Sequence, residues 1–277
     1  MTQFVNNVKT AVLLGGMFAL ILAIGSFWGS QGVTIALVLA VAMNFFAYFY
    51  SDKIALKAMR GQEVDADVAP DLVNMVERLA RNANLPMPRV YICPQQAPNA
   101  FATGRNPKHA AVAVTQGALR LLSYEELEGV MAHELAHVKN RDTLISTVAA
   151  TIAGAISYLG WIFLFSGGGG RNVHPVMLLV LFLLAPIAAA LIQMAISRSR
   201  EYVADADGAR IAGTPAGLMA ALQKLEATAK RVPMENEMPS QNHMFIVQPL
   251  SGATTMAKLF STHPSTEQRI AKLRELA

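Results

Sequence analysis

The sequence predicts an α+β protein in which a mainly helical polar domain with a small sheet is combined with four transmembrane helices. The chain of 277 residues is 53% hydrophobic and only 15% charged, which is more apolar than a soluble domain of this size. Its apolar residues gather in four long runs, separated by polar segments with helix and strand patterns. Part of the chain is therefore expected to lie in a lipid bilayer.

The four apolar runs contain no Asp, Glu, Lys, Arg or His, unlike most buried helices of soluble cores. At about 1.5 Å rise per residue, each can cross or nearly cross a hydrocarbon core of about 30 Å. The first could instead be a cleaved signal peptide, but Lys9 is the only basic residue before it. The third and fourth could also wrap the polar domain in part. The runs are residues 11–28, 33–50, 143–165 and 176–196.

Basic residues near these runs predict the orientation of the chain. They gather on one side, whereas the other side has an uncharged turn and a single arginine, Arg171. The side rich in Lys and Arg is the cytoplasmic one in membrane proteins. We therefore expect both termini and the polar segments in the cytoplasm. The division is a transmembrane hairpin at 1–50, a first domain part at 51–142, a second hairpin at 143–196 and a second domain part at 197–277.

The polar segments contain recognisable elements. A helix with an apolar face is predicted in APDLVNMVERLARNANLP, and short strands are predicted in RVYIC and HAAVAVT, separated by the turn-rich PQQAPNAFATGRNPK. Thr214 and Pro215 resemble a cap and first turn before a further helix, and PSTEQRIAKLREL closes the chain as an amphipathic helix. These elements predict the small sheet and the mainly helical character of the domain.

Composition excludes several classes of function. The lone Cys93 cannot form an internal disulfide and is interpreted as a buried structural thiol. The net charge is +4, but the basic residues flank apolar runs and form no stripe with interleaved aromatics, so no nucleic acid partner is expected. The glycine run at 167–170 lacks the pattern of a phosphate loop, so no nucleotide site is expected.

One motif carries chemistry. Residues His133 to His137 form an HExxH pattern, and a capping box of Ser123 and Glu126 predicts that it lies on a helix. Two histidines one turn apart can both reach one zinc ion at about 2.0–2.1 Å. Glu134 between them is placed to act as a general base. If this helix continues, the metal lies about 10 Å from the start of the third apolar run.

A catalytic zinc ion needs a third protein ligand and keeps an open position. The candidate segment is SRSREYVADADGARIAG, which begins where the fourth apolar run ends. Glu201 could complete a His-His-Glu site, and Asp205, one turn later, could accept a hydrogen bond from a ligand histidine. Alternatively, both are surface acids beside nearby arginines. Spacing alone leaves both interpretations open, although the surrounding Ala and Gly residues permit close helix packing.

Two segments together, HELAHVKNRD and SRSREYVADADGA, resemble the signature pair of the HtpX group of membrane zinc metallopeptidases, relatives of the CAAX prenyl endopeptidases. The order of apolar runs is similar over essentially the whole chain. The resemblance implies that His133, His137 and Glu201 bind one zinc ion and that Glu134 is the catalytic acid/base. It also implies a gluzincin-like peptidase fold with four spans.

The resemblance implies further site residues. NAFATGRNPKHAAVAVTQGAL resembles the segment that supplies the edge strand for an extended peptide substrate, for which the candidates are Asn99, Ala110, Ala111, Val112, Ala113 and Val114. Alternatively, Asn99 only stabilises a turn. His263 resembles a histidine that stabilises the developing oxyanion; alternatively, it punctuates a loop with the proline that follows.

The remaining histidines and one aspartate are not expected to bind metal. His109 is predicted to start a strand, His174 to lie in the loop across the membrane, and His243 to lie in a polar loop. Asp142, at the edge of the third apolar run, is expected to pair with a neighbouring Arg or Lys.

The leading functional hypothesis is an ATP-independent endopeptidase of the bacterial inner membrane, induced by stress, that cleaves damaged membrane proteins at the cytoplasmic face. A narrower alternative is a dedicated processing enzyme for specific membrane or lipidated proteins. A third hypothesis is an inactive, zinc-stabilised scaffold, but Glu134 argues against it because a purely structural site does not need that carboxylate.

Overall fold

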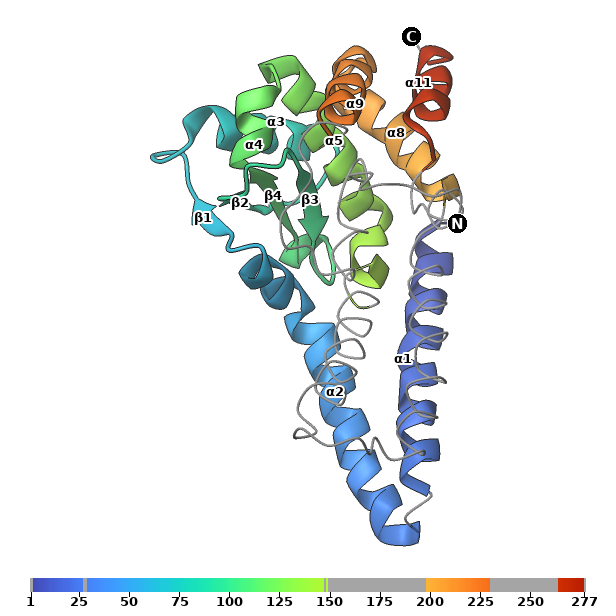
Figure 1. Cartoon of the computed structure of the whole chain (residues 1–277). Coiled ribbons are helices and arrows are strands. Elements are labelled where there is room, and N and C mark those ends of the chain that lie inside the picture. Colours follow the sequence, from blue (N-terminus) through green and yellow to red (C-terminus); the bar gives the residue numbers. More distant parts are fainter. Residues whose placement is uncertain (1, 27–28, 147, 149–197, 230–263, 277) are drawn as a thin grey trace, which may run out of the picture.

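Two long helices extend from one side of a smaller domain built around a sheet (Figure 1). The computed structural model describes residues 2–26, 29–146, 148, 198–229 and 264–276. The long helices are α1, Thr2–Ser26, and α2, Gly29–Ala58, and they contact each other as a hairpin. At about 1.5 Å per residue, α2 is about 45 Å long, which exceeds the thickness of a hydrocarbon core.

Both long helices have the character of membrane spans. Their apolar segments, Phe4–Ala23 and Gly29–Ala58, are long and apolar enough to cross a bilayer, and only 24% and 17% of their most apolar windows are buried. Exposed large apolar side chains such as Val38 and Phe46 distinguish them from core helices of a soluble protein. The predicted first and second spans are thus confirmed as candidate membrane helices.

The predicted third and fourth spans lie almost entirely outside the described residues, so they stay predictions. The start of the third apolar run is described, and it joins the hairpin. Leu144, Ile145 and Val148 form a buried apolar cluster with Leu13 and Met17 of α1 and with Ala47 of α2. This run therefore begins by packing between the two N-terminal helices.

The sheet has four strands in the order β1-β2-β4-β3. β2 and β4 are parallel, whereas β1 and β3 pair antiparallel on the two edges. β2 and β4 confirm the two strands predicted from the sequence. The strands are β1, Gln62–Val64; β2, Arg89–Cys93; β3, Ala100–Thr103; and β4, Ala111–Thr115.

The prediction that residues 110–114 form an edge strand was wrong. β4 lies between β2 and β3, and all five of its residues are buried, as is typical of a strand covered on both faces. The free edge beside the helices belongs to β3, inside the segment that the sequence indicated to be turns. His109 does not start a strand either, because it lies in a short 3-10 turn, Pro107–His109.

The two faces of the sheet pack against different partners. Val90, Val112 and Val114 face the helices of the domain and join their large apolar core. The opposite face, with Tyr91, Cys93, Phe101, Ala111 and Ala113, packs on Leu56 and Met59 at the end of α2. The sheet is therefore held between the helical core and the end of a membrane helix, and Cys93 is buried as predicted.

The predicted helices are present with their expected caps and apolar faces. Leu72, Met75, Val76 and Leu79 are all buried in the first of them, and the capping box of Ser123 with Glu126 starts α5. The helices are α3, Pro70–Asn82; α4, Gln116–Leu121; α5, Tyr124–Asn140; α8, Arg198–Ala212; α9, Ala216–Ala229; and α11, Thr266–Arg274. α5 packs against α8, α9 and the edge strand β3.

Helix α5 does not run unbroken into the third apolar run, as the sequence had suggested it could. It ends at Asn140, and Arg141 takes a left-handed conformation with φ 59°. The chain resumes as helix from Asp142. Because left-handed residues terminate helices, the metal motif and the apolar run are two helical segments joined by a turn.

Candidate metal centre

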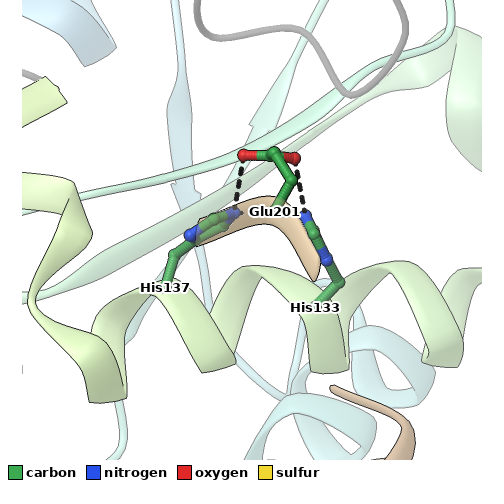
Figure 2. Close-up of side chains that lie close together, drawn as sticks. All are labelled: His133, His137 and Glu201. Carbon is green, nitrogen blue, oxygen red and sulfur yellow. Dashed lines mark hydrogen bonds and ion pairs between the residues drawn. The ribbon is translucent and has the colours of Figure 1, made fainter. Parts of the chain in front are cut away.

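Three ligand-type side chains converge from two helices. His133 and His137 lie one turn apart on α5, and Glu201 comes from the first turn of α8 (Figure 2). Their nearest ligand atoms all lie within 4.8 Å of one another. The two histidine Nε2 atoms are 3.1 Å apart, and the Glu201 oxygens lie 3.8 Å from His133 Nε2 and 3.6 Å from His137 Nε2. The structure thus brings together the three residues that the resemblance implied.

The hydrogen bonds of the imidazoles fix which nitrogen offers a lone pair. His133 Nδ1 lies 3.0 Å from Asp205 Oδ1, and His137 Nδ1 lies 3.0 Å from Asp142 Oδ2. Carboxylates accept hydrogen bonds, so each neutral ring carries its proton on Nδ1 and turns its Nε2 lone pair toward Glu201. Three acceptors facing one point call for a cation between them.

The donor set fits zinc. Four ligands arranged as a tetrahedron at about 2.0–2.1 Å from zinc are about 3.3 Å from one another. The two histidine Nε2 atoms, 3.1 Å apart, lie close to that value, and one ligand atom from each of the three residues lies within 4.8 Å of the others. Two imidazole nitrogens and one carboxylate leave a fourth position open, as in catalytic zinc sites.

The electrostatic environment around the two histidines differs. Burial alone would lower the pKa of His137, but its hydrogen bond to Asp142 and the charge of Glu201 outweigh burial and raise it to about 9. Burial and the nearby Arg269 lower the pKa of His133 despite its bond to Asp205. The carboxylates therefore favour a positive charge beside His137, and a bound metal cation would supply that charge.

Glu134 lies beside the cluster and is buried. Burial raises its pKa to about 7, and Glu201 adds to the rise, while His137 opposes it. The backbone N–H of Ala102 in β3 donates a hydrogen bond to its carboxylate. The candidate general base Glu134 thus contacts the edge strand β3. Its pKa lies near neutral pH, where a general base is most effective.

Asp142 is more than the surface partner that the sequence suggested. It lies 3.7 Å from Arg200 Nη1, in agreement with an Arg partner, but it also holds His137. Asp142 Oδ2 faces His137, and Asp142 Oδ1 accepts a hydrogen bond from Asn6 Nδ2 of α1 at 2.6 Å. A chain of contacts therefore runs from the first membrane helix through Asp142 to a metal ligand.

Sequence reasoning missed Arg269, the buried cation behind the site. It is 1% exposed, and its Nη2 and Nε donate to the two oxygens of Asp205 at 2.6 and 2.9 Å. Its Nη1 lies 3.8 Å from Glu201 Oε2. The charge of Arg269 lowers the pKa of Asp205 to about 2, although burial alone would raise it. A signal was present, because Arg269 stands on the buried face of α11 with Ile270 and Leu273.

The other predicted site residues are not part of the cluster. Asn99 is 1% exposed, and its backbone bonds to Thr115 of β4, so both interpretations of Asn99 stay predictions. His109 is exposed and bonds to Asn106. His263, His174 and His243 lie outside the described residues. Among the residues that the structure does describe, the group of His133, His137 and Glu201 is the one with metal-binding geometry.

Comparison with known proteins decides the family. Residues 66–277 match peptidase family M48. The chain belongs to this family. It is 57% identical to "Protease HtpX homolog" of Desulfatibacillum aliphaticivorans, over 97% of this chain and 89% of that protein. It is 56% identical to the protein of the same description from Methylibium petroleiphilum, over 97% and 96%. The chain is thus a metallopeptidase of family M48, whose members are in general zinc-dependent.

A solved structure shares the fold of this M48 chain. The crystal structure of S. mikatae Ste24p matches with a TM-score of 0.54 at 18% identity, over 98% of this chain and 65% of that chain. At this identity the similarity concerns the fold alone. Together with the two apolar helices, the family assignment supports a membrane protease.

Proposed function

We propose that this M48 peptidase is an ATP-independent zinc endopeptidase with one zinc ion, embedded in a bacterial inner membrane, that cleaves damaged or misfolded membrane proteins at the cytoplasmic face. The proposal includes the multi-pass topology, a gluzincin-like domain and a role in the stress response. One observation carries it: a His-His-Glu cluster with a buried glutamate beside it, within a domain that is packed directly on a membrane helix.

Each residue of the site has a defined part in the proposed reaction. A bound zinc ion supplies a Lewis acid that makes water acidic near neutral pH and polarises a peptide carbonyl. Glu134 takes the proton of the attacking water as the new C–O bond forms, and passes it to the leaving amine as the C–N bond breaks. Asp205 and Asp142 keep the imidazoles oriented.

The edge strand β3 is the proposed docking strand for the substrate backbone. Asn99 O accepts a hydrogen bond from Thr115 N at 2.9 Å. The backbone N–H and C=O groups of every second residue from Asn99 onward therefore face β4, and those of Ala100 and Ala102 face the opposite edge of β3. Ala102 N–H reaches Glu134 there. An extended peptide added along this edge would pass over α5 beside the metal ligands. This assigns to β3 the role that the sequence had suggested for residues 110–114.

The Glu134→Gln variant tests the proposal. It removes the proton acceptor and keeps the three ligands, so purified protein should retain zinc while cleavage of casein falls by about 10²–10⁴-fold. Glu128→Gln is the matched control, because Glu128 lies on the same helix and pairs with Arg78 on the domain surface. Equal cleavage by Glu134→Gln and the parent would show that this mechanism is wrong, and zinc binding without any cleavage by the parent would favour the scaffold.

The same variant separates general quality control from dedicated processing. In cells, Glu134→Gln should leave many damaged membrane proteins uncleaved, and quantitative proteomics of the membrane fraction measures how many accumulate. Accumulation of a single protein would instead assign the enzyme to the processing of that substrate.

A further inference from the structure

A pocket lies at the junction of the membrane helix α2 and the sheet, away from the metal centre. Its volume is about 440 Å³, and four of its seven lining residues are basic. The walls are formed by Lys53 and Lys57 of α2, by Arg60 and Gly61 in the turn after it, and by Arg89 and Tyr91 of β2. None of these residues takes part in the proposed peptidase reaction, so the pocket requires a separate explanation.

The position of the pocket along α2 places it at the surface of a bilayer. The apolar run of α2 ends at Tyr50, and Lys53 and Lys57 follow about 4.5 and 10 Å further along the helix axis. The headgroup layer of a bilayer begins where the hydrocarbon ends and is about 5–7 Å thick. Lys53 Nζ also lies 5.1 Å from the ring centre of Tyr50, an aromatic side chain typical of this interface. Lys53 therefore lies within the headgroup layer, and Lys57 lies just beyond it, from where a long basic side chain can reach back to the lipid phosphates.

The basic side chains of the pocket are not all neutralised within the protein. Arg89 Nη2 pairs with Asp52 at 2.9 Å, and Tyr91 Oη donates to Glu63 at 2.7 Å. In the described part of the chain, Lys53, Lys57 and Arg60 have no acidic partner, and their side chains are exposed. Three positive charges therefore line the pocket without an acidic partner among the described residues.

Arg60 lies in the turn that follows α2. Its φ is 48°, a left-handed conformation of the kind that terminates helices. The turn directs the chain from α2 into β1, and the backbone N–H of Arg60 bonds to Lys57 O at 3.0 Å. The exposed side chain of Arg60 is thereby placed at the pocket.

We propose that this pocket binds the phosphate of an anionic phospholipid headgroup. A phosphate diester supplies the negative charge that Lys53, Lys57 and Arg60 lack, and cationic pockets beside membrane helices are suited to such groups. A soluble phosphate ester has the same chemistry, but the depth of the pocket favours the lipid. The proposal rests on α2 crossing the bilayer and is independent of the peptidase activity. A bound headgroup would fix the height of the sheet above the membrane, because the same end of α2 packs on it.

The test counts lipids on the full-length protein. The parent and its variants are reconstituted in discs of phosphatidylcholine and phosphatidylglycerol in equal parts, extracted in neutral detergent and examined by native mass spectrometry. The parent should retain phosphatidylglycerol in preference to phosphatidylcholine. K57Q/R60Q should lower that preference by about fivefold for each charge removed, from about 1 kcal/mol per basic residue near an anionic surface.

A matched control distinguishes lipid binding in the pocket from general attraction of lipids by the charge of the protein surface. R105Q/K108Q removes the same charge, and Arg105 lies over the ring of Phe49, close to the same depth beside α2 but outside the pocket. This control should keep the preference of the parent. An equal loss in both double variants, or no loss in K57Q/R60Q, would overturn the proposal.

Two further arms complete the design. Added glycerol 3-phosphate should not displace the bound phosphatidylglycerol, and displacement at matched concentration would assign the pocket to a soluble ligand instead. K53Q, which changes another exposed side chain at the rim, should lower the preference by itself if the double variant fails to fold. Mass spectrometry of bound lipid does not depend on peptide cleavage. A negative result would therefore refute the lipid site without bearing on the proposed peptidase activity.

Discussion

At the scale of single residues, the metal centre depends on a buried layer of charges behind the ligands. Asp205 orients His133, and Arg269 holds Asp205 through two hydrogen bonds. Removing one partner of a buried ion pair leaves the other charge without compensation, which typically costs about 3–5 kcal/mol. We therefore propose that Arg269 is a positioning residue that would act on a bound metal through Asp205 and Glu201.

Replacing Arg269 tests this role. Arg269→Ala should weaken zinc binding by about 10–100-fold, the usual effect of losing a partner of a ligand. Arg269→Lys should have an intermediate effect, because Lys keeps the charge without the planar two-bond geometry. Arg274→Ala, on an exposed position of the same helix, is the control. Zinc affinity is measured by competition with a chelator, and unchanged affinity in Arg269→Ala would refute the role.

Residues of the site differed in how far sequence could predict them. His133 and His137 could be found because their spacing is local and a helix fixes their geometry. Arg269 could not be paired with Asp205, because 64 residues separate them and only the packing of α11 on α8 brings them together. Asp142 was expected to pair with a neighbouring Arg or Lys, and it lies 3.7 Å from Arg200. Its bond to His137 depends on the turn at Arg141, which periodicity does not reveal.

At the scale of elements, the close approach of α5 and α8 positions the third ligand. A Cβ on Gly208 would lie 2.9 Å from His133 Cα and 3.0 Å from His133 N. The backbone of one ligand helix thus touches the other beside a metal ligand, as the Ala and Gly residues around Glu201 had suggested. Glycine is required at this position by space, and its φ is not unusual.

Gly208→Ala should therefore damage the metal centre through packing. The added methyl must push α8 away from α5, which costs about 1–3 kcal/mol of folding stability and moves Glu201 from the histidines. Gly16→Ala in α1 is the control, because a Cβ there meets nothing within 4 Å. Thermal unfolding and zinc affinity are measured together. If Gly208→Ala had the same melting temperature and the same zinc affinity as the parent, close packing at Gly208 would not be needed to position Glu201.

The elements themselves were predictable where their patterns were long. α3, α5 and α11 have apolar faces and caps that can be identified locally, and β2 and β4 are apolar runs. β1 and β3 have only three and four residues, too few for a pattern to stand out among Gly, Pro and Asn. The order of strands is a tertiary property, which is why β4 was mistaken for the edge.

At the scale of the whole molecule, the membrane helices and the metal centre form one structure. α2 packs on one face of the sheet, while α1 reaches the ligands through Asn6, Asp142 and His137. The sequence indicated that the metal site lies next to lipid. It placed the site between the third and fourth apolar runs, which lie almost entirely outside the described residues; within the described residues, α1 and α2 make the contacts.

Breaking the link from α1 should weaken zinc binding without touching a ligand. Asn6→Ala removes the hydrogen bond to Asp142, so His137 is less firmly oriented, and an affinity loss up to about tenfold is expected. Asn7→Ala is the matched control, because Asn7 is exposed and Asn6 is buried. Equal zinc affinities for the two variants would show that the membrane helix does not support the site.

The central claim is that His133, His137 and Glu201 hold one catalytic zinc ion. X-ray absorption at the zinc edge on the purified full-length chain, with metal content measured on the same sample, tests it most directly. We expect one zinc ion per chain, bound by two imidazole nitrogens and a carboxylate oxygen at about 2.0–2.1 Å, and loss of that zinc in Glu201→Ala. A sulfur ligand, or full zinc content in Glu201→Ala, would contradict it.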